Sequence, residues 1–76
     1  MEKNYNLDQI KEMFEITSKV RESIRGIYSA RDDYRINGKN ERKKLKSLIP
    51  KYNKIVPKEI QEFLKINSKT LEDALK

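Results

Sequence analysis

The lysines and arginines are the residues of this sequence whose type and spacing indicate a binding function. The chain has 18 Lys and Arg against 12 Asp and Glu, so its formal net charge is +6 at pH 7. The segment GKNERKKLKSLIPKYNK (38–54) holds seven of these cations against Glu41 alone. Clustered cations attract polyanions, and each phosphate that they neutralise releases a counterion. The segment therefore predicts contact with a nucleic-acid backbone.

The positive charge is segregated along the chain. Residues 1–20 have a net charge of −1, residues 21–56 of +7 and residues 57–76 of 0. A solvated helix face in a lysine-rich protein is the alternative interpretation of this pattern. The residues expected to contact phosphates are Arg42, Lys43, Lys44 and Lys46, extended by Lys39 and Lys51 and supplemented by Lys19, Arg21 and Arg25.

Residue types that serve catalysis or metal binding are scarce. The chain has no Cys and no His, which removes thiolates, sulfur-ligated metals and the commonest general base. The adjacent acid pairs are Asp32-Asp33 and Glu72-Asp73. Neighbouring residues on a helix point about 100° apart, so neither pair forms a carboxylate dyad by itself. A two-carboxylate site would need acids from distant segments. We expect no enzymatic activity, no cofactor and no metal.

The tyrosines could either pack in a core or stack on bases. Tyr34 and Tyr52 flank the basic segment, where aromatic rings could stack on nucleobases. Core or rim packing is the favoured interpretation for both, and also for Tyr5 and Tyr28.

Length and hydropathy indicate one small domain over residues 1–76. A chain of this size buries only about 60% of its unfolded surface, so association with a copy or a partner would add to a marginal core. No apolar run approaches the roughly 20 residues that span a bilayer. The start, MEKNYNLDQIKEMF, lacks the apolar region of a signal peptide. We therefore expect a cytoplasmic protein with no membrane partner.

The first half of the chain predicts one long helix, from Leu7 to about Arg35. Asn6 is a candidate N-cap, and Gln9 stands at the capping-box position. A heptad-like stripe offers a seam to a second helix or a second chain, with a homodimer predicted through Ile10, Met13, Val20, Ile24 and Ile27. A rival interpretation breaks this helix within residues 15–18, where Thr17 or Ser18 could cap a new one.

Turn and cap residues divide the second half into further helices. Asn37-Gly38 indicates a turn with Gly38 as a left-handed cap, and Asn40 could cap the next helix. That helix would kink or restart at Pro50. Pro57 fits the first turn of another helix. The remaining expectations are that Ile60, Phe63 and Leu64 point inward, and that Ser68 caps a last helix that buries Leu71 and either Ala74 or Leu75. No β-hairpin signal occurs, so the fold class is all-α, a small bundle of three to five helices.

The residues Ile60, Phe63, Leu64, Ile66, Ser68, Thr70, Leu71 and Ala74 resemble a helix-turn-helix DNA-binding motif. The resemblance covers about a quarter of the chain and departs from the motif at Lys65, where the turn favours Gly. Residues 9–25 align with residues 59–75 at six identities, which predicts a second copy upstream. The upstream second helix would expose Lys19, Arg21, Glu22 and Arg25, whereas the downstream one would expose Lys69, Glu72, Asp73 and Lys76. Base reading is therefore expected from residues 17–25, and packing from the C-terminal hairpin.

Two functions are compatible with this sequence. The first is a small nucleic-acid-binding regulatory protein, of the kind that mobile elements encode, which contacts DNA more readily than RNA. The second is a protein-interaction module, such as a phage inhibitor or adaptor, that docks its helices on an acidic protein surface. A basic helix lying on anionic lipid is a weaker third, because the apolar residues of 45–49 have a core to join.

Overall fold

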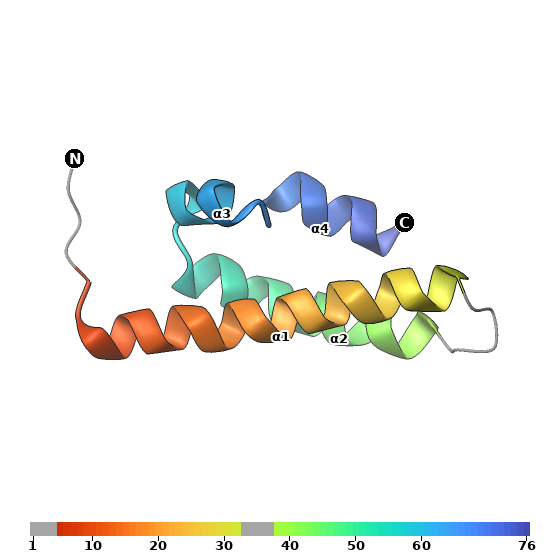
Figure 1. Ribbon diagram of the computed structural model, residues 1–76, viewed down its shortest axis with the longest axis horizontal. Helices are drawn as coiled ribbons and strands as arrows, with labels where there is room; N and C mark the ends of the chain where they lie inside the picture. The colour runs from red at the N-terminus through yellow and green to blue at the C-terminus, as the bar shows by residue number, and fades with distance from the viewer. Residues whose placement is uncertain (1–4, 33–37) are drawn as a thin grey trace.

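A computed structural model describes residues 5–32 and 38–76, and these residues form four helices without a strand. The helices are α1 (Leu7–Asp32), α2 (Gly38–Ile55), α3 (Lys58–Leu64) and α4 (Ser68–Leu75). The predicted all-α fold is thereby confirmed. Figure 1 shows α1 and α2 lying side by side and antiparallel, with α3 and α4 following each other along one side of this pair.

The helix α1 begins at a capping box and continues without a break. The Asn6 side chain accepts a hydrogen bond from the Gln9 backbone N–H at 2.8 Å, and the Gln9 side chain accepts one from the Asn6 N–H at 2.9 Å. The rival interpretation of a break within residues 15–18 is wrong, because α1 runs through them as one long helix. Ile16 and Thr17 are buried there, so their packing outweighs the lower helix propensity of β-branched residues. A helix-turn-helix in residues 9–25 is excluded for the same reason.

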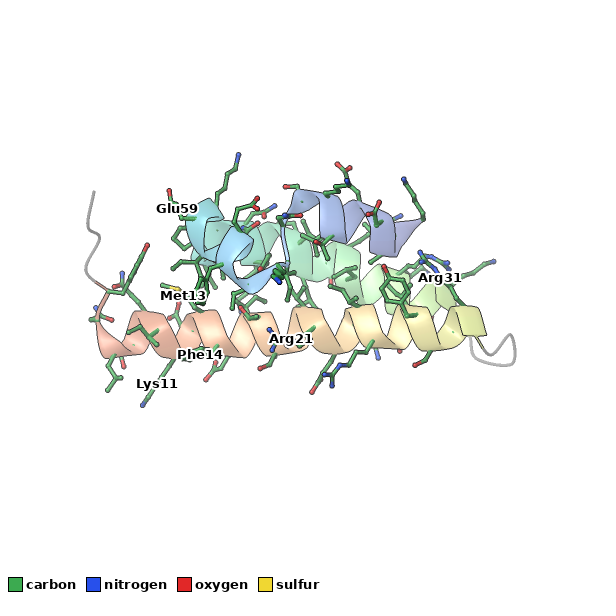
Figure 2. All side chains as sticks on the ribbon, turned by 45° about the horizontal axis from the view of Figure 1, so that its top comes forward. Lys11, Met13, Phe14, Arg21, Arg31 and Glu59 are labelled. Carbon is green, nitrogen blue, oxygen red and sulfur yellow. The ribbon has the colours of Figure 1, made fainter. Side chains whose placement is uncertain are left out.

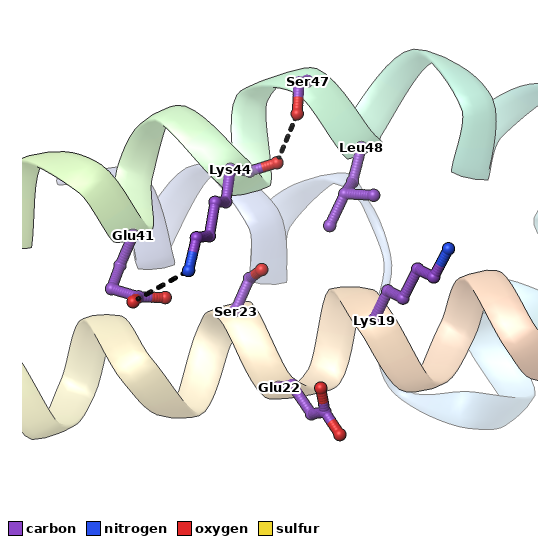
Figure 3. Close-up of a pocket in the computed structure, with 7 residues that line it drawn as sticks. All are labelled: Lys19, Glu22, Ser23, Glu41, Lys44, Ser47 and Leu48. Carbon is purple, nitrogen blue, oxygen red and sulfur yellow. Dashed lines mark hydrogen bonds and ion pairs between the residues drawn. The ribbon is translucent and has the colours of Figure 1, made fainter.

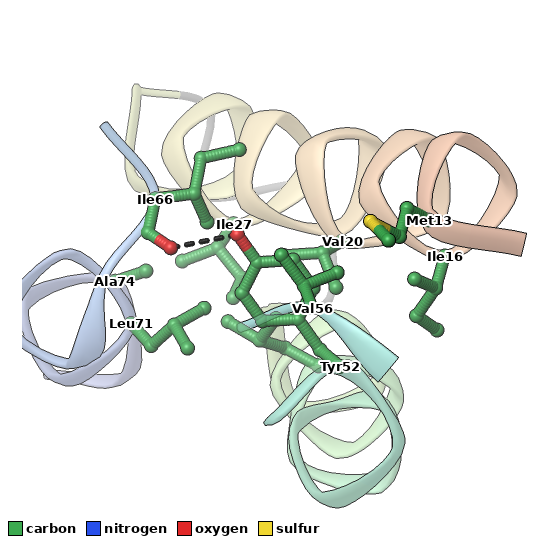
Figure 4. Packing of buried hydrophobic residues seen from close by; sticks show 10 residues of the cluster. Met13, Ile16, Val20, Ile27, Tyr52, Val56, Ile66, Leu71 and Ala74 are labelled. Atoms are coloured by element: carbon green, nitrogen blue, oxygen red, sulfur yellow. Dashed lines mark hydrogen bonds between the residues drawn. The ribbon is translucent and has the colours of Figure 1, made fainter. Parts of the chain in front are cut away.

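The apolar stripe of α1 packs against its own chain. Met13, Val20 and Ile27 are buried, and they meet residues from α2, from α4 and from the two turns around α3 (Figure 4). The core consists of Met13, Ile16, Val20, Ile27, Leu45, Tyr52, Val56, Ile66, Leu71 and Ala74. The prediction that this stripe joins two chains is therefore wrong, since its central members have no surface left for a partner.

The helix α2 starts earlier in the sequence than predicted and is continuous from Gly38 to Ile55. Gly38 is its first residue and has no positive φ, so the left-handed cap at Gly38 is wrong. Asn40 lies inside the helix rather than at its cap, and the expectation for Asn37 falls outside the described residues. The helix also continues past Pro50 without a restart. Because Pro50 is exposed, the carbonyl that loses its N–H donor can be hydrated.

A buried amide organises the corner between α2 and α3. Gln61 is buried, and its Nε2 donates to the Val56 carbonyl at 2.9 Å and to the Asn53 side chain at 3.1 Å. Phe63 is instead 85% exposed, so its predicted inward position is wrong. Ile60 and Leu64 are partly buried against the core, as expected. Pro57 is the N-cap of α3 rather than a residue of its first turn.

The turn into α4 uses a left-handed residue and an asparagine cap. Lys65 has φ of 61° and ψ of 29°, which is the conformation that favours Gly at this position of a turn. Asn67, not Ser68, caps α4, because its side chain accepts a hydrogen bond from the Thr70 N–H at 3.0 Å. Leu71 and Ala74 are buried as predicted.

Tyr52 joins α2 to this turn. Its side chain is fully buried, and its hydroxyl donates to the Ile66 carbonyl at 2.7 Å (Figure 4). Burial raises the pKa of Tyr52 from 10.0 to about 12, and the positive charge of Arg21 opposes part of that rise. The tyrosine is therefore a core residue, and its ring is closed to nucleobases.

We expect Tyr52→Phe to lower the free energy of unfolding by about 1–3 kcal/mol, because the buried Ile66 carbonyl loses its donor. The pKa of Tyr52 is higher in the folded state, so this contribution is complete below pH 10 and is lost as the pH rises from 10 to 12. Urea unfolding at pH 8 and at pH values up to 12 measures both effects. Tyr28→Phe is the control, since Tyr28 is 41% exposed. An equal alkaline loss of stability in Tyr52→Phe and the parent protein would contradict this assignment.

Arg31 fastens the end of α4 to α1. Its Nη2 donates to the carbonyls of Asp73 and Ala74, both at 2.9 Å, and its guanidinium lies 4.8 Å from the centre of the Tyr28 ring. Figure 2 shows Arg31 at the far end of α1, beside α4. A cation at a helix C-terminus satisfies carbonyls that have no partner within the helix and also stabilises the helix dipole.

Replacing Arg31 with Gln should lower the free energy of unfolding by about 1–2 kcal/mol, because two carbonyls at the end of α4 lose a charged donor. Arg31→Lys should recover part of the loss, since a lysine lacks the planar fork. Thermal unfolding gives the stability, and amide exchange of residues 71–75 gives the local effect. If amide exchange in α4 of Arg31→Gln stayed at the rate of the parent protein, the proposed role of Arg31 in holding the end of α4 would be wrong.

Candidate nucleic-acid interface

The exposed side of α2 carries lysines and no acid. Its exposed residues are Lys39, Asn40, Lys43, Lys44, Lys46, Ser47, Pro50, Lys51, Asn53 and Lys54. Six of these ten residues are lysines and none is an acid. From Lys39 to Lys54 the helix rises by about 22 Å. We call these six lysines the α2 lysine face.

The buried side of α2 determines where these lysines point. Leu45 and Tyr52 are fully buried, so the opposite side of the helix faces solvent. Lys39, Lys43, Lys46 and Lys54 fall within about 80° of one another around the helix axis, at 100° per residue. They form the centre of the α2 lysine face, while Lys44 and Lys51 stand on the flank toward α1.

The flank toward α1 carries compensating acids. Glu41 is the one acid of α2; it is partly buried and lies 3.5 Å from the Lys44 Nζ. Together with Lys19, Glu22 and Ser23 of α1, this pair lines an open cavity of about 350 Å³ (Figure 3). Lys19 and Lys51 also line a neighbouring cavity of about 240 Å³ that includes Glu12 and Glu15. The local field on this flank is therefore weaker than at the centre of the face.

The structure separates Arg21 and Arg25 from the α2 lysine face. Arg21 follows Phe14 by seven residues, on the side of α1 that Phe14 shares with α3. Its charge acts on the Tyr52 hydroxyl at the α3–α4 turn. Arg25 lies one turn further along the same exposed stripe. The sequence prediction grouped both arginines with the lysines, but the fold places them on a different surface.

Arg42 is less accessible than the lysines of α2, and Lys54 joins their face although it was not predicted to. Arg42 is only partly exposed, and its guanidinium packs so closely over Gly38 that a Cβ there would lie 3.1 Å from Nη1. Lys54 was not among the predicted phosphate contacts, yet it extends the centre of the face by two helical turns beyond Lys46. Its spacing of eight residues from Lys46 was the signal that could have identified it.

Neither a search for other kinds of site nor a comparison with known proteins indicates a function. In residues 5–32 and 38–76, no three acids lie close enough together to hold a metal ion, and no helix is long and apolar enough to cross a membrane. Comparison with protein families, curated proteins and solved structures found no match.

Pro50 interrupts the hydrogen bonding of α2 in the middle of this face. We expect Pro50→Ala to raise the free energy of unfolding by about 1–3 kcal/mol, because alanine restores the missing N–H and removes the ring clash in an exposed position. Urea unfolding measures the change, with Ser47→Ala as the control at another exposed position of α2. No increase in stability would show that α2 has adapted its local geometry to the proline ring.

Proposed function

We propose that this protein binds duplex DNA through the α2 lysine face. The observation that carries the proposal is the composition of that face, with six lysines and no acid among ten exposed residues. The exposed side of a helix that contacts only water could carry acids as well as lysines. The C-terminal part of the chain shows the contrast, because Glu59, Glu62 and Glu72 are exposed beside its lysines.

The residue type favours phosphates over bases as the contacts. A lysine ammonium is a compact point charge on a flexible stem, whereas base edges are read by arginine, asparagine and glutamine in paired geometry. Phosphate contacts set affinity and position without reading sequence. We therefore propose binding that depends strongly on salt and weakly on sequence.

The shape of the face favours DNA over RNA duplexes. A helix with its side chains is about 10–12 Å across, which matches the major groove of B-DNA at about 12 Å. The major groove of A-form RNA is too narrow for side chains to enter. The helix α4 is a poorer fit to either, because its exposed side carries the acid Glu72. In this proposal the α3–α4 hairpin supports the fold and α2 makes the contacts.

Binding to a fluorescent DNA duplex should weaken linearly in a double-logarithmic plot against salt between 50 and 200 mM. The expected slope is about −0.9 for each neutralised phosphate, and so approaches about −5 if all six lysines contribute. The variant Lys43→Glu/Lys46→Glu should lose about tenfold or more in affinity at low salt. Glu41→Gln should bind more tightly than the parent protein, because it releases Lys44 from its ion pair.

The matched control is Lys58→Glu/Lys69→Glu, which changes the net charge by the same amount at exposed positions of α3 and α4. This variant should keep most of the affinity. Equal losses in the two double variants would mean that only net charge matters, and the α2 lysine face would not be the interface.

A further inference from the structure

A second surface of the molecule is apolar and lies apart from the α2 lysine face. It is a groove of about 290 Å³ between α1 and α3, lined mainly by Ile10, Met13, Phe14, Ile60, Phe63 and Leu64. None of the residues that line it belongs to α2. Figure 2 shows Met13 between the two helices.

The rims of this groove expose large apolar side chains. Phe63 on α3 is 85% exposed, Phe14 on α1 is 66% exposed, and Leu7 at the start of α1 is 68% exposed. The largest exposed apolar patch of a soluble monomer is often an interaction surface. Removing them from water on two copies would bury on the order of 1,000 Å², which is about the minimum for a specific interface.

The two rims carry opposite charges. On α1 the exposed stripe Leu7, Lys11, Phe14, Ser18, Arg21 contains two cations and no acid. On α3 the exposed Glu59 lies one turn before Phe63, with Glu62 beside them. Figure 2 shows Lys11 and Glu59 on opposite sides of the groove. A partner helix of uniform charge would be attracted by one rim and repelled by the other.

We infer that the occupant of this groove is a second copy of the chain, related by a two-fold axis parallel to the groove. Such an axis places the α1 rim of one copy against the α3 rim of the other, so that each cationic rim meets an acidic one. Phe14 then faces the partner subunit's Phe63, and Lys11 faces the partner subunit's Glu59. This interface differs from the stripe predicted from the sequence, most of which is buried within the monomer.

The first test is the mass of the protein in solution as a function of concentration, measured by sedimentation without nucleic acid. The parent protein should dimerise, and Phe63→Glu should raise the dissociation constant of the dimer by about tenfold or more. Because Phe63 is 85% exposed, this variant should keep its helix content. Ser47→Glu adds the same charge at an exposed position of α2, and it should leave the dissociation constant unchanged.

The second test uses charge reversal to identify the pairing. Lys11→Glu alone and Glu59→Lys alone each place like charges across both halves of the interface, so each variant should be mostly monomeric. An equimolar mixture of the two variants restores opposite charges at both contacts and should form heterodimers.

The proposal is overturned by a parent protein that stays monomeric up to millimolar concentration, which would leave the groove to a foreign helix. It is also overturned if the mixture of Lys11→Glu and Glu59→Lys remains as monomeric as each variant alone. Because these measurements contain no DNA, they are independent of the proposed DNA binding.

Discussion

The burial of Tyr52 is the constraint on which the rest of the structure depends. Its ring fills the space between α1, α2 and α4, and its hydroxyl bonds the carbonyl of Ile66 in the turn between α3 and α4. A single side chain therefore orients α2 and positions the C-terminal hairpin. Because residues on a helix are fixed relative to one another, turning Tyr52 and Leu45 inward turns the α2 lysines outward. Core packing thus determines the electrostatics of the surface.

The start and the length of α1 were predictable from the sequence, whereas several contacts between elements were not. The capping box of Asn6 and Gln9 and the length of α1 follow from local spacing, which needs no knowledge of neighbours. Gln61 was missed because its burial depends on the Val56 carbonyl at the end of α2. Arg31 interrupts an apolar stripe in the sequence, but its role depends on where α4 ends. Phe63 was expected inside with Ile60 and Leu64, but it is 85% exposed in the structure.

The candidate site shows the same division. Five of the six lysines of the α2 lysine face were predicted from the density of cations along the chain, whereas Lys54 was missed although it lies on the same helix. Arg21 and Arg25 were expected to supplement these contacts but lie on another surface, because charge density along the chain carries no information about which side of α1 faces α3. Glu41 illustrates a further limit: its pairing with Lys44 is local to α2, but its partial burial depends on the position of α1.

The separation of the two surfaces has a consequence for how the protein would act on DNA. Since the groove between α1 and α3 contains no residue of α2, association through it would leave the lysines of both copies exposed. Two basic faces in one particle bind a long polyanion with an effective concentration that a monomer lacks, which strengthens binding without any new contact. The two lysine faces could also hold separate duplexes together. Association through the apolar groove would then explain two observations together. Binding to DNA would be cooperative in protein concentration, and its salt dependence would be steeper than six lysines account for.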